Sequence, residues 1–429
     1  MALAAGFLGG ARSRLLPASI PLRFFGAAIV FHLLGWLALL AGAGSLPRFA
    51  GGLGWPLAGL HLMTLGVLVM SAIGAGLQLL PVATRQPVGA TRWPALLWWL
   101  YTPGVAAVAM GMGLGAPALL GAGAAAVVLA LLLFALLLGA NLRGARGMPG
   151  VVAHGWAALA CLLVLLASAL SLAGSYLGWP GIDRASALAL HLPFASYGFM
   201  GLLALGLSAI LVPMFALAPA PATRPQLVSC GLVVAALALA AAAAFGVAPQ
   251  GLRMTAIGLG AVAVVLHLRL MHAALRSGMR RELGRSFVLV RVGWALLVAS
   301  LAAALSLMLQ LPLPGAATLF GLLLIGGWLL SFLLGILQRV LPFLASMHVA
   351  GGSRRPPTPS SLSAERPLAL HFHCHLAALA GLTAAAVADA PWLAALATAV
   401  GAVGAAAFGA FFIILLRRMR AVAQPPISR

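Results

Sequence analysis

Apolar runs dominate the chain, and each is long enough to cross a lipid bilayer. A helix needs about 20 mostly apolar residues to span the roughly 30 Å hydrocarbon core. Twelve runs, which we number spans 1 to 12, lie at 24–44, 56–80, 94–113, 116–139, 152–176, 186–214, 227–247, 253–275, 287–310, 315–344, 368–388 and 391–416. Strands of a barrel would alternate polar and apolar residues, so these runs predict helices. We therefore expect an all-α integral membrane protein.

The composition excludes a water-soluble protein and a nucleic-acid binder. Hydrophobic residues make up 63% of the 429 residues and charged residues only 7%, whereas soluble domains carry about 25% charged residues. A net charge of +21 is typical of nucleic-acid binding, but here the basic residues lie in short loops between apolar runs. The predicted partner is the lipid bilayer, with no nucleic acid.

All 25 basic residues are arginines, and their positions predict an orientation. If the N-terminus is cytoplasmic, 22 arginines fall on the cytoplasmic side and only Arg48, Arg184 and Arg253 on the other. By the positive-inside rule, both termini are then cytoplasmic. We expect a multi-pass protein of the bacterial inner membrane. The one long cytoplasmic connection, Gly351 to Arg366, is rich in Ser, Pro and Arg and is predicted to be a flexible linker.

Spans 2, 6 and 10 end alike, which indicates an internal repeat. A glycine leads through apolar residues to a proline at Gly76–Pro81, Gly206–Pro213 and Gly335–Pro342. The prolines are 132 and 129 residues apart (213 − 81 and 342 − 213), and each interval holds four spans. A proline at a helix end stops the helix, so we expect the three helices to end at these positions. The single membrane domain, 1–429, would then contain three four-helix units at about 24–139, 152–275 and 287–416; chance recurrence of Gly and Pro is the alternative.

This arrangement resembles subunit I of the haem-copper oxidase superfamily. Span 2, from His61 through Gly74-Ala75-Gly76, is similar to the family's second helix, where a histidine ligates low-spin haem. Span 6, from His191, is similar to the sixth helix, where a histidine ligates copper. Span 10, with Gly327-Trp328, is similar to the tenth helix of the C-type oxidases. The resemblance implies haem and copper as cofactors, and respiratory-chain subunits or electron-transfer proteins as partners.

The sequence also departs from this family. The His-x-His of the tenth helix is replaced by Phe320 and Leu322, and span 7 has no pair of adjacent histidines. At most two of the six expected ligands are present, so we do not expect oxygen reduction and assign no catalytic residue. The chain looks more like divergent relatives such as the NnrS family, which has twelve spans and is linked to the nitric oxide response. Of that family's His-rich signature on the second span, only His61 is present.

Histidines within the spans are the candidate cofactor ligands. His61 and His191 lie near the outer ends of their spans, and His32 lies near the middle of span 1. A titratable residue inside the membrane is costly and is a functional candidate for that reason. Neutral imidazole is the form that binds metals, so all three could ligate haem or copper. Helix–helix hydrogen bonds are the alternative explanation.

A second group of histidines is predicted at the cytoplasmic face. His371 and His375 are four residues apart and so share one face of span 11. Together with His154 or His348 they could bind copper, zinc or iron, since imidazole suits all three metals. The alternative is a set of interfacial histidines beside arginines and lipid headgroups. His371-Phe372-His373 is itself a His-x-His, but it cannot replace the missing one, because it lies on a different helix and at the opposite face.

The four acidic residues leave two other functions open. Asp183, Glu282, Glu365 and Asp389 all lie in loops or at span ends. A proton-coupled transporter normally needs a buried carboxylate, so this class is disfavoured. A cofactor-free transporter of a small neutral or anionic solute remains an alternative, as does an assembly partner of a respiratory complex.

Overall fold

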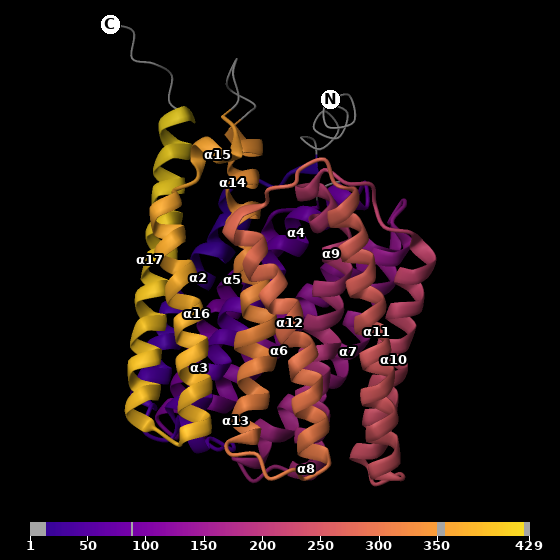
Figure 1. Ribbon diagram of the computed structural model, residues 1–429, viewed down its shortest axis with the longest axis vertical. Coiled ribbons are helices and arrows are strands. Elements are labelled where there is room, and N and C mark those ends of the chain that lie inside the picture. Colours follow the sequence, from indigo (N-terminus) through magenta and orange to yellow (C-terminus); the bar gives the residue numbers. More distant parts are fainter. Residues whose placement is uncertain (1–13, 87–88, 350–356, 424–429) are drawn as a thin grey trace, which may run out of the picture.

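The computed structural model describes residues 14–86, 89–349 and 357–423 as a bundle of long helices (Figure 1). Within these ranges, twelve helical spans are long and apolar enough to cross a membrane, which confirms the predicted number. The chain is a multi-pass membrane protein. Nine of these spans are single helices: α2 (Ser19–Ala41), α5 (Arg92–Gly113), α6 (Pro117–Arg143), α7 (Pro149–Ser175), α10 (Thr223–Ala244), α11 (Pro249–Ser277), α12 (Gly284–Met308), α16 (Glu365–Ala388) and α17 (Pro391–Ala423).

The other three spans, 2, 6 and 10, each contain a π-helical segment between two α-helices. They are α3 (Trp55–His61), η3 (Leu62–Val69) and α4 (Met70–Ala83); α8 (Arg184–Pro193), η4 (Phe194–Gly201) and α9 (Leu202–Ala216); and α13 (Ala316–Gly321), η5 (Leu322–Leu330) and α14 (Ser331–Val349). The π segments begin 19, 19 and 20 residues before the three repeated prolines (81 − 62, 213 − 194 and 342 − 322). Because π-helices are rare and are frequent at functional sites, these three spans hold the positions of greatest interest.

Spans 2, 6 and 10 are also the most buried spans of the described chain. In their most apolar windows 67%, 78% and 56% of residues are buried, against 50% or less in the other nine spans. The segment η5 contacts both η3 and η4, so the three π segments meet inside the bundle. The surrounding helices expose large apolar side chains such as Leu136 and Trp99, as expected where lipid replaces water.

Glycines let spans 1 and 2 pack closely. A Cβ added to Gly59 would lie 2.7 Å from the side chain of Leu39, and one added to Gly66 would lie 2.6 Å from Cβ of Phe31. Both neighbours belong to α2. Small residues at helix interfaces in membranes allow this approach. One face of span 2 is therefore closed by α2 along much of its length.

The repeated prolines do not end their helices, so that prediction is wrong. Pro81, Pro213 and Pro342 lie inside α4, α9 and α14, which continue for two, three and seven more residues (83 − 81, 216 − 213 and 349 − 342). A proline removes one backbone N–H donor. Proline is nevertheless tolerated in membrane helices, because other groups nearby can bond the freed carbonyl.

The two ends of the bundle differ in charge. We call the end where α2 begins the Arg-rich end, and the end with Arg48, Arg184 and Arg253 the Arg-poor end. In Figure 1, α14 and α15 (Pro359–Leu362) lie at the Arg-rich end, and α8 and α13 at the Arg-poor end. The arginine content of the loops therefore distinguishes one end of the bundle from the other.

Half of the predicted linker, Gly351 to Arg366, is folded. Residues 351–356 lie outside the described residues, but α15 and the first turn of α16 occupy much of the remainder. The Ser346 hydroxyl donates to the carbonyl oxygen of Pro357 at 2.6 Å, and Arg418 donates to the carbonyls of Ser361 and Ser363. This half is bound to α14 and α17, in contrast to the prediction of a flexible linker.

Candidate metal centre

The structure brings His61 and His191 together inside the bundle. His61 ends α3 and His191 lies in the last turn of α8, six and seven residues after the first residues of their spans (61 − 55 and 191 − 184). At 1.5 Å per residue, both lie about 10 Å inside the Arg-poor end. Their ring centroids are 6.4 Å apart, with 31° between the ring planes.

Both rings keep a nitrogen that is available to a ligand. His61 Nδ1 lies 3.0 Å from the carbonyl oxygen of Leu57. It can only donate to that oxygen, so Nε2 of the neutral ring carries a lone pair. His191 Nδ1 is buried and has no hydrogen-bond partner within the described chain. Imidazole–metal bonds are about 2 Å long, so a separation of 6.4 Å leaves room for an ion between the rings.

Span 10 adds only apolar groups at the positions of the missing His-x-His. Phe320 lies in α13 and Leu322 begins η5, one turn from the Arg-poor end of the helix. Deeper in the bundle, the Tyr197 ring of η4 stacks on Trp328 of η5 with centroids 5.6 Å apart. Spans 6 and 10 therefore meet here through aromatic packing.

A second histidine cluster contains His32, His371 and His375. The His371 ring lies 6.0 Å from that of His32 and 5.8 Å from that of His375, and all three side chains are at most 2% exposed. The stacked rings of His371 and His375 share one face of α16, as the sequence predicts. The sequence does not predict that His32 joins them, because nothing local links it to span 11.

The bonds of this cluster fix which nitrogens stay free. His371 Nδ1 faces the carbonyl oxygen of Gly404 at 3.1 Å and must donate to it, so Nε2 holds a lone pair. His375 Nε2 lies 2.8 Å from the Ser331 hydroxyl, which itself donates to the carbonyl of Gly326 at 3.1 Å. The hydroxyl thus accepts from His375, and Nδ1 keeps a lone pair. Both free nitrogens are buried and unpartnered within the described chain.

His32 has the opposite polarity. The Trp36 indole N–H donates to His32 Nε2 at 3.1 Å, which leaves the proton of the neutral ring on the buried, unpartnered Nδ1. His32 thus keeps a free donor, whereas His371 and His375 each keep a free acceptor. In the part of the chain that the structure describes, no three His, Cys, Asp or Glu side chains are arranged to hold a metal ion. An ion at His371 and His375 would therefore have only these two nitrogens of the described chain as ligands, with His32 beside them.

The structure does not bring His154 or His348 to this pair. His154 donates from Nδ1 to the carbonyl of Gly150 at 2.7 Å and packs against Gly206 of span 6. His348 has both ring nitrogens engaged, at 2.8 Å from the carbonyl of Leu344 and 3.0 Å from that of Leu16. A metal at His348 would have to displace one of these bonds. We leave both residues out of the centre.

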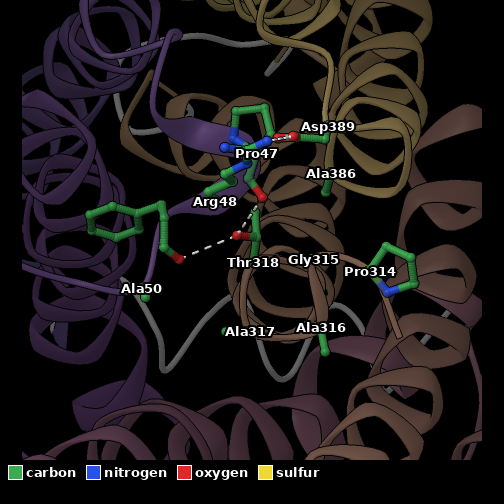
Figure 2. Close-up of a pocket in the computed structure, with 11 residues that line it drawn as sticks. Pro47, Arg48, Ala50, Pro314, Gly315, Ala316, Ala317, Thr318, Ala386 and Asp389 are labelled. Carbon is green, nitrogen blue, oxygen red and sulfur yellow. Dashed lines mark hydrogen bonds and ion pairs between the residues drawn. The ribbon is translucent and has the colours of Figure 1, made fainter. Parts of the chain in front are cut away.

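A cleft of about 360 Å³ opens at the Arg-poor end, where α13 begins (Figure 2). Figure 2 shows Asp389 facing Arg48, and these side chains form an exposed ion pair. The Thr318 hydroxyl lies 3.2 Å from the carbonyl oxygens of Pro47 and Phe49 and ties the loop after α2 to α13. The cleft lies one turn from Phe320, at the mouth of span 10.

Known proteins resemble this chain in fold. No protein family model matches it, and no curated protein is similar in sequence. Among solved structures, a haem-copper terminal oxidase dimer studied by electron cryo-microscopy matches with a TM-score of 0.65 and 12% sequence identity, over 96% of this chain and 86% of that chain. The chain has a haem-copper oxidase fold. At this identity the likeness concerns the fold alone, and the site must be argued from the side chains.

Proposed function

We propose that this protein binds copper or haem through His61 and His191 and does not reduce oxygen. The observation that carries the proposal is the 6.4 Å separation of the two rings, on inner helices of an oxidase fold. In the resemblance drawn from the sequence, spans 2 and 6 each supply a metal ligand. Two neutral imidazoles with free nitrogens are a suitable ligand set for copper.

Each cofactor makes a different demand on the site. A copper ion between the rings would use both histidines. Haem iron would take the lone pair of His61 Nε2, whose ring is oriented by its bond to Leu57, as is usual for metal-bound histidines. The face of span 2 that carries Gly59 and Gly66 is filled by α2, so a porphyrin would have to occupy the His191 side. Bound metal would supply either reversible coordination of a small molecule or reversible uptake of an electron.

A role in nitric oxide, metal or other respiratory physiology, as in NnrS-like proteins, fits these residues better than terminal oxidation. Oxygen reduction at a binuclear centre needs a haem iron beside a copper ion with three histidines. Phe320 and Leu322 supply no ligand from span 10, and span 7 has no pair of adjacent histidines. At least four of the six expected ligands are therefore missing. An electron-transfer protein or a respiratory-chain subunit is then the expected partner. We also propose that the Arg-rich end faces the cytoplasm of a bacterial inner membrane.

The three-unit organisation belongs to the same proposal. The second helix of each unit would be an inner span with a π segment at the same distance from its proline, within one residue. If the units share a common ancestor, His61 and His191 occupy similar positions in two equivalent helices, which would explain why their rings lie side by side. The pair His371 and His375, with His32 beside it, is proposed as a second, weaker ion site, six and ten residues into α16 from the Arg-rich end (371 − 365 and 375 − 365).

The test is metal analysis and an absorption spectrum of the purified full-length protein, oxidised and reduced, after expression with haem precursor and copper supplied. We expect bound copper or a Soret band, lost in the double variant His61→Ala/His191→Ala. The matched control is His272→Ala/His373→Ala, which removes two exposed histidines. Wild-type protein with neither bound metal nor a Soret band would contradict the proposal and favour the cofactor-free transporter. Equal cofactor content in both double variants would move the site elsewhere.

A further inference from the structure

A pocket of about 540 Å³ lies at the Arg-rich end, and its lining residue Leu368 is one turn of α16 before His371. It is enclosed by the end of α9, the start of α12, α14 and the folded segment 357–365. Three arginines line it, Arg280, Arg285 and Arg339. Among the described residues, the only acidic one lining the pocket is Glu365, and it pairs with Arg285 at 3.9 Å across an exposed gap. The pocket therefore carries an excess of positive charge.

Arg339 is held in place by its own bonds. Its Nε donates to the hydroxyl of Ser286 at 2.8 Å, and Nη2 donates to the carbonyl oxygen of Leu283. A long side chain fixed in this way loses little conformational entropy when it meets a ligand. The guanidinium is a planar donor fork that suits the oxygens of phosphate. One wall of the pocket is thus already organised for an anion.

Gln338 provides an independent sign of a missing ligand. Its side chain lines the pocket and is only 5% exposed, yet its Nε2 has no hydrogen-bond partner within the described chain. Leaving a buried donor unpaired costs about 1–3 kcal/mol. Gly284, Arg285 and Ser286 of the pocket are also the first turn of α12, whose N–H groups favour anions. The unpaired amide of Gln338 calls for a hydrogen-bond acceptor, and the arginines and the start of α12 favour an acceptor with negative charge.

We propose that the pocket binds a phosphate group, presented by the headgroup of an acidic phospholipid. Phe215, Phe343 and Leu368 form an apolar wall beside the arginines. A free phosphate would leave that wall bare, whereas the glycerol and first acyl carbons of a lipid would cover it. Basic pockets between membrane helices are known to hold acidic headgroups in this way. The bound lipid would link the folded segment 357–365 to α9, α12 and α14.

The test uses the full-length protein in a neutral detergent, with native mass spectrometry and thermal unfolding as readouts. Separate arms receive phosphatidylglycerol, phosphatidylcholine or inorganic phosphate. We expect phosphatidylglycerol to bind and to raise Tm, and phosphatidylcholine to do neither. Arg280→Gln/Arg285→Gln should weaken phosphatidylglycerol binding by roughly tenfold or more, at about a factor of five per arginine near a headgroup.

The control variant is Arg143→Gln/Arg224→Gln, which removes two exposed arginines from the same end of the bundle but outside the pocket. Equal binding to both double variants would overturn the pocket and indicate general surface charge. Gln338→Met keeps the volume and removes the unpaired donor, and it should also weaken binding. If inorganic phosphate raises Tm as much as the lipid does, the lipid source is wrong. No binding of either anion by wild-type protein would overturn the proposal as a whole.

Discussion

The rings of His61 and His191 lie 6.4 Å apart although 130 residues separate them in the chain (191 − 61). Each histidine sits just before a π segment of an inner helix, in the same part of its span. A π turn adds a residue and rotates the side chains that follow it. Two helices with a π segment at the same place can therefore direct equivalent residues, here His61 and His191, toward each other.

If one ion bridges the two rings, their substitutions must be non-additive. His61→Ala and His191→Ala should each lower copper affinity by at least tenfold, on the order of a lost ligand interaction, and the double variant should be little worse than either single one. Competition titration against a copper chelator measures all four affinities. Fully additive losses would mean two separate sites.

The second site predicts a metal-dependent rise in stability. In a His61→Ala/His191→Ala background, copper or zinc at about 100 times its Kd should stabilise the fold by about 2.7 kcal/mol. His375→Gln should remove that effect, because it deletes one of the two free nitrogens. His373→Gln, on the exposed face of the same helix, is the control. A stabilisation that survives His375→Gln would exclude this pair as the ligand.

Close packing at span 10 predicts a strongly position-dependent effect of glycine substitution. A Cβ on Gly335 would lie 2.5 Å from the backbone oxygen of Ser286, so Gly335→Ala must push α12 and α14 apart. We expect a cost of about 1–3 kcal/mol and a lower Tm. A Cβ on Gly258 of α11 would meet no atom of the described chain within 4 Å, so Gly258→Ala should be neutral or stabilise by up to about 1 kcal/mol. Equal Tm changes in the two variants would contradict this packing.

The hydrogen bonds of Asp183 predict that the stability of the first turn of span 6 depends on pH. The nearby hydroxyl of Ser186, and the backbone N–H of Ser186 that donates to the Asp183 carboxylate at 2.9 Å, hold the pKa of Asp183 below its ordinary value. Its stabilisation of α8 is thus present above about pH 3.9, the usual aspartate pKa, and is lost as pH falls through the lowered native pKa.

Asp183→Ala should therefore speed amide hydrogen exchange in the first turn of α8 at neutral pH, with a smaller difference from wild type in acid. Asp183→Asn keeps an N-cap acceptor and should remain close to wild type at neutral pH. The same exchange rate in all three proteins would show that the cap contributes nothing to this helix end.

The sequence alone determined the number of spans, the nearness of His371 to His375 and the charge difference between the two ends. These features depend on local chemistry, since a run of about 20 apolar residues must form a helix in lipid and an i, i+4 spacing must share a face. It did not determine where the helices end. Pro81, Pro213 and Pro342 lie inside helices because surrounding groups can compensate for the lost hydrogen bond.

Only the tertiary structure decided which distant residues meet. His32 joins His371 and His375, His154 does not, and His61 faces His191. Polar residues within apolar spans, such as Ser331, which bonds to His375 of another helix, are signals of helix contacts that a sequence does show. Their partners are not visible in it, because contacts between helices depend on packing angles and π turns, and an apolar sequence rich in Leu, Ala and Gly fits many packings equally well.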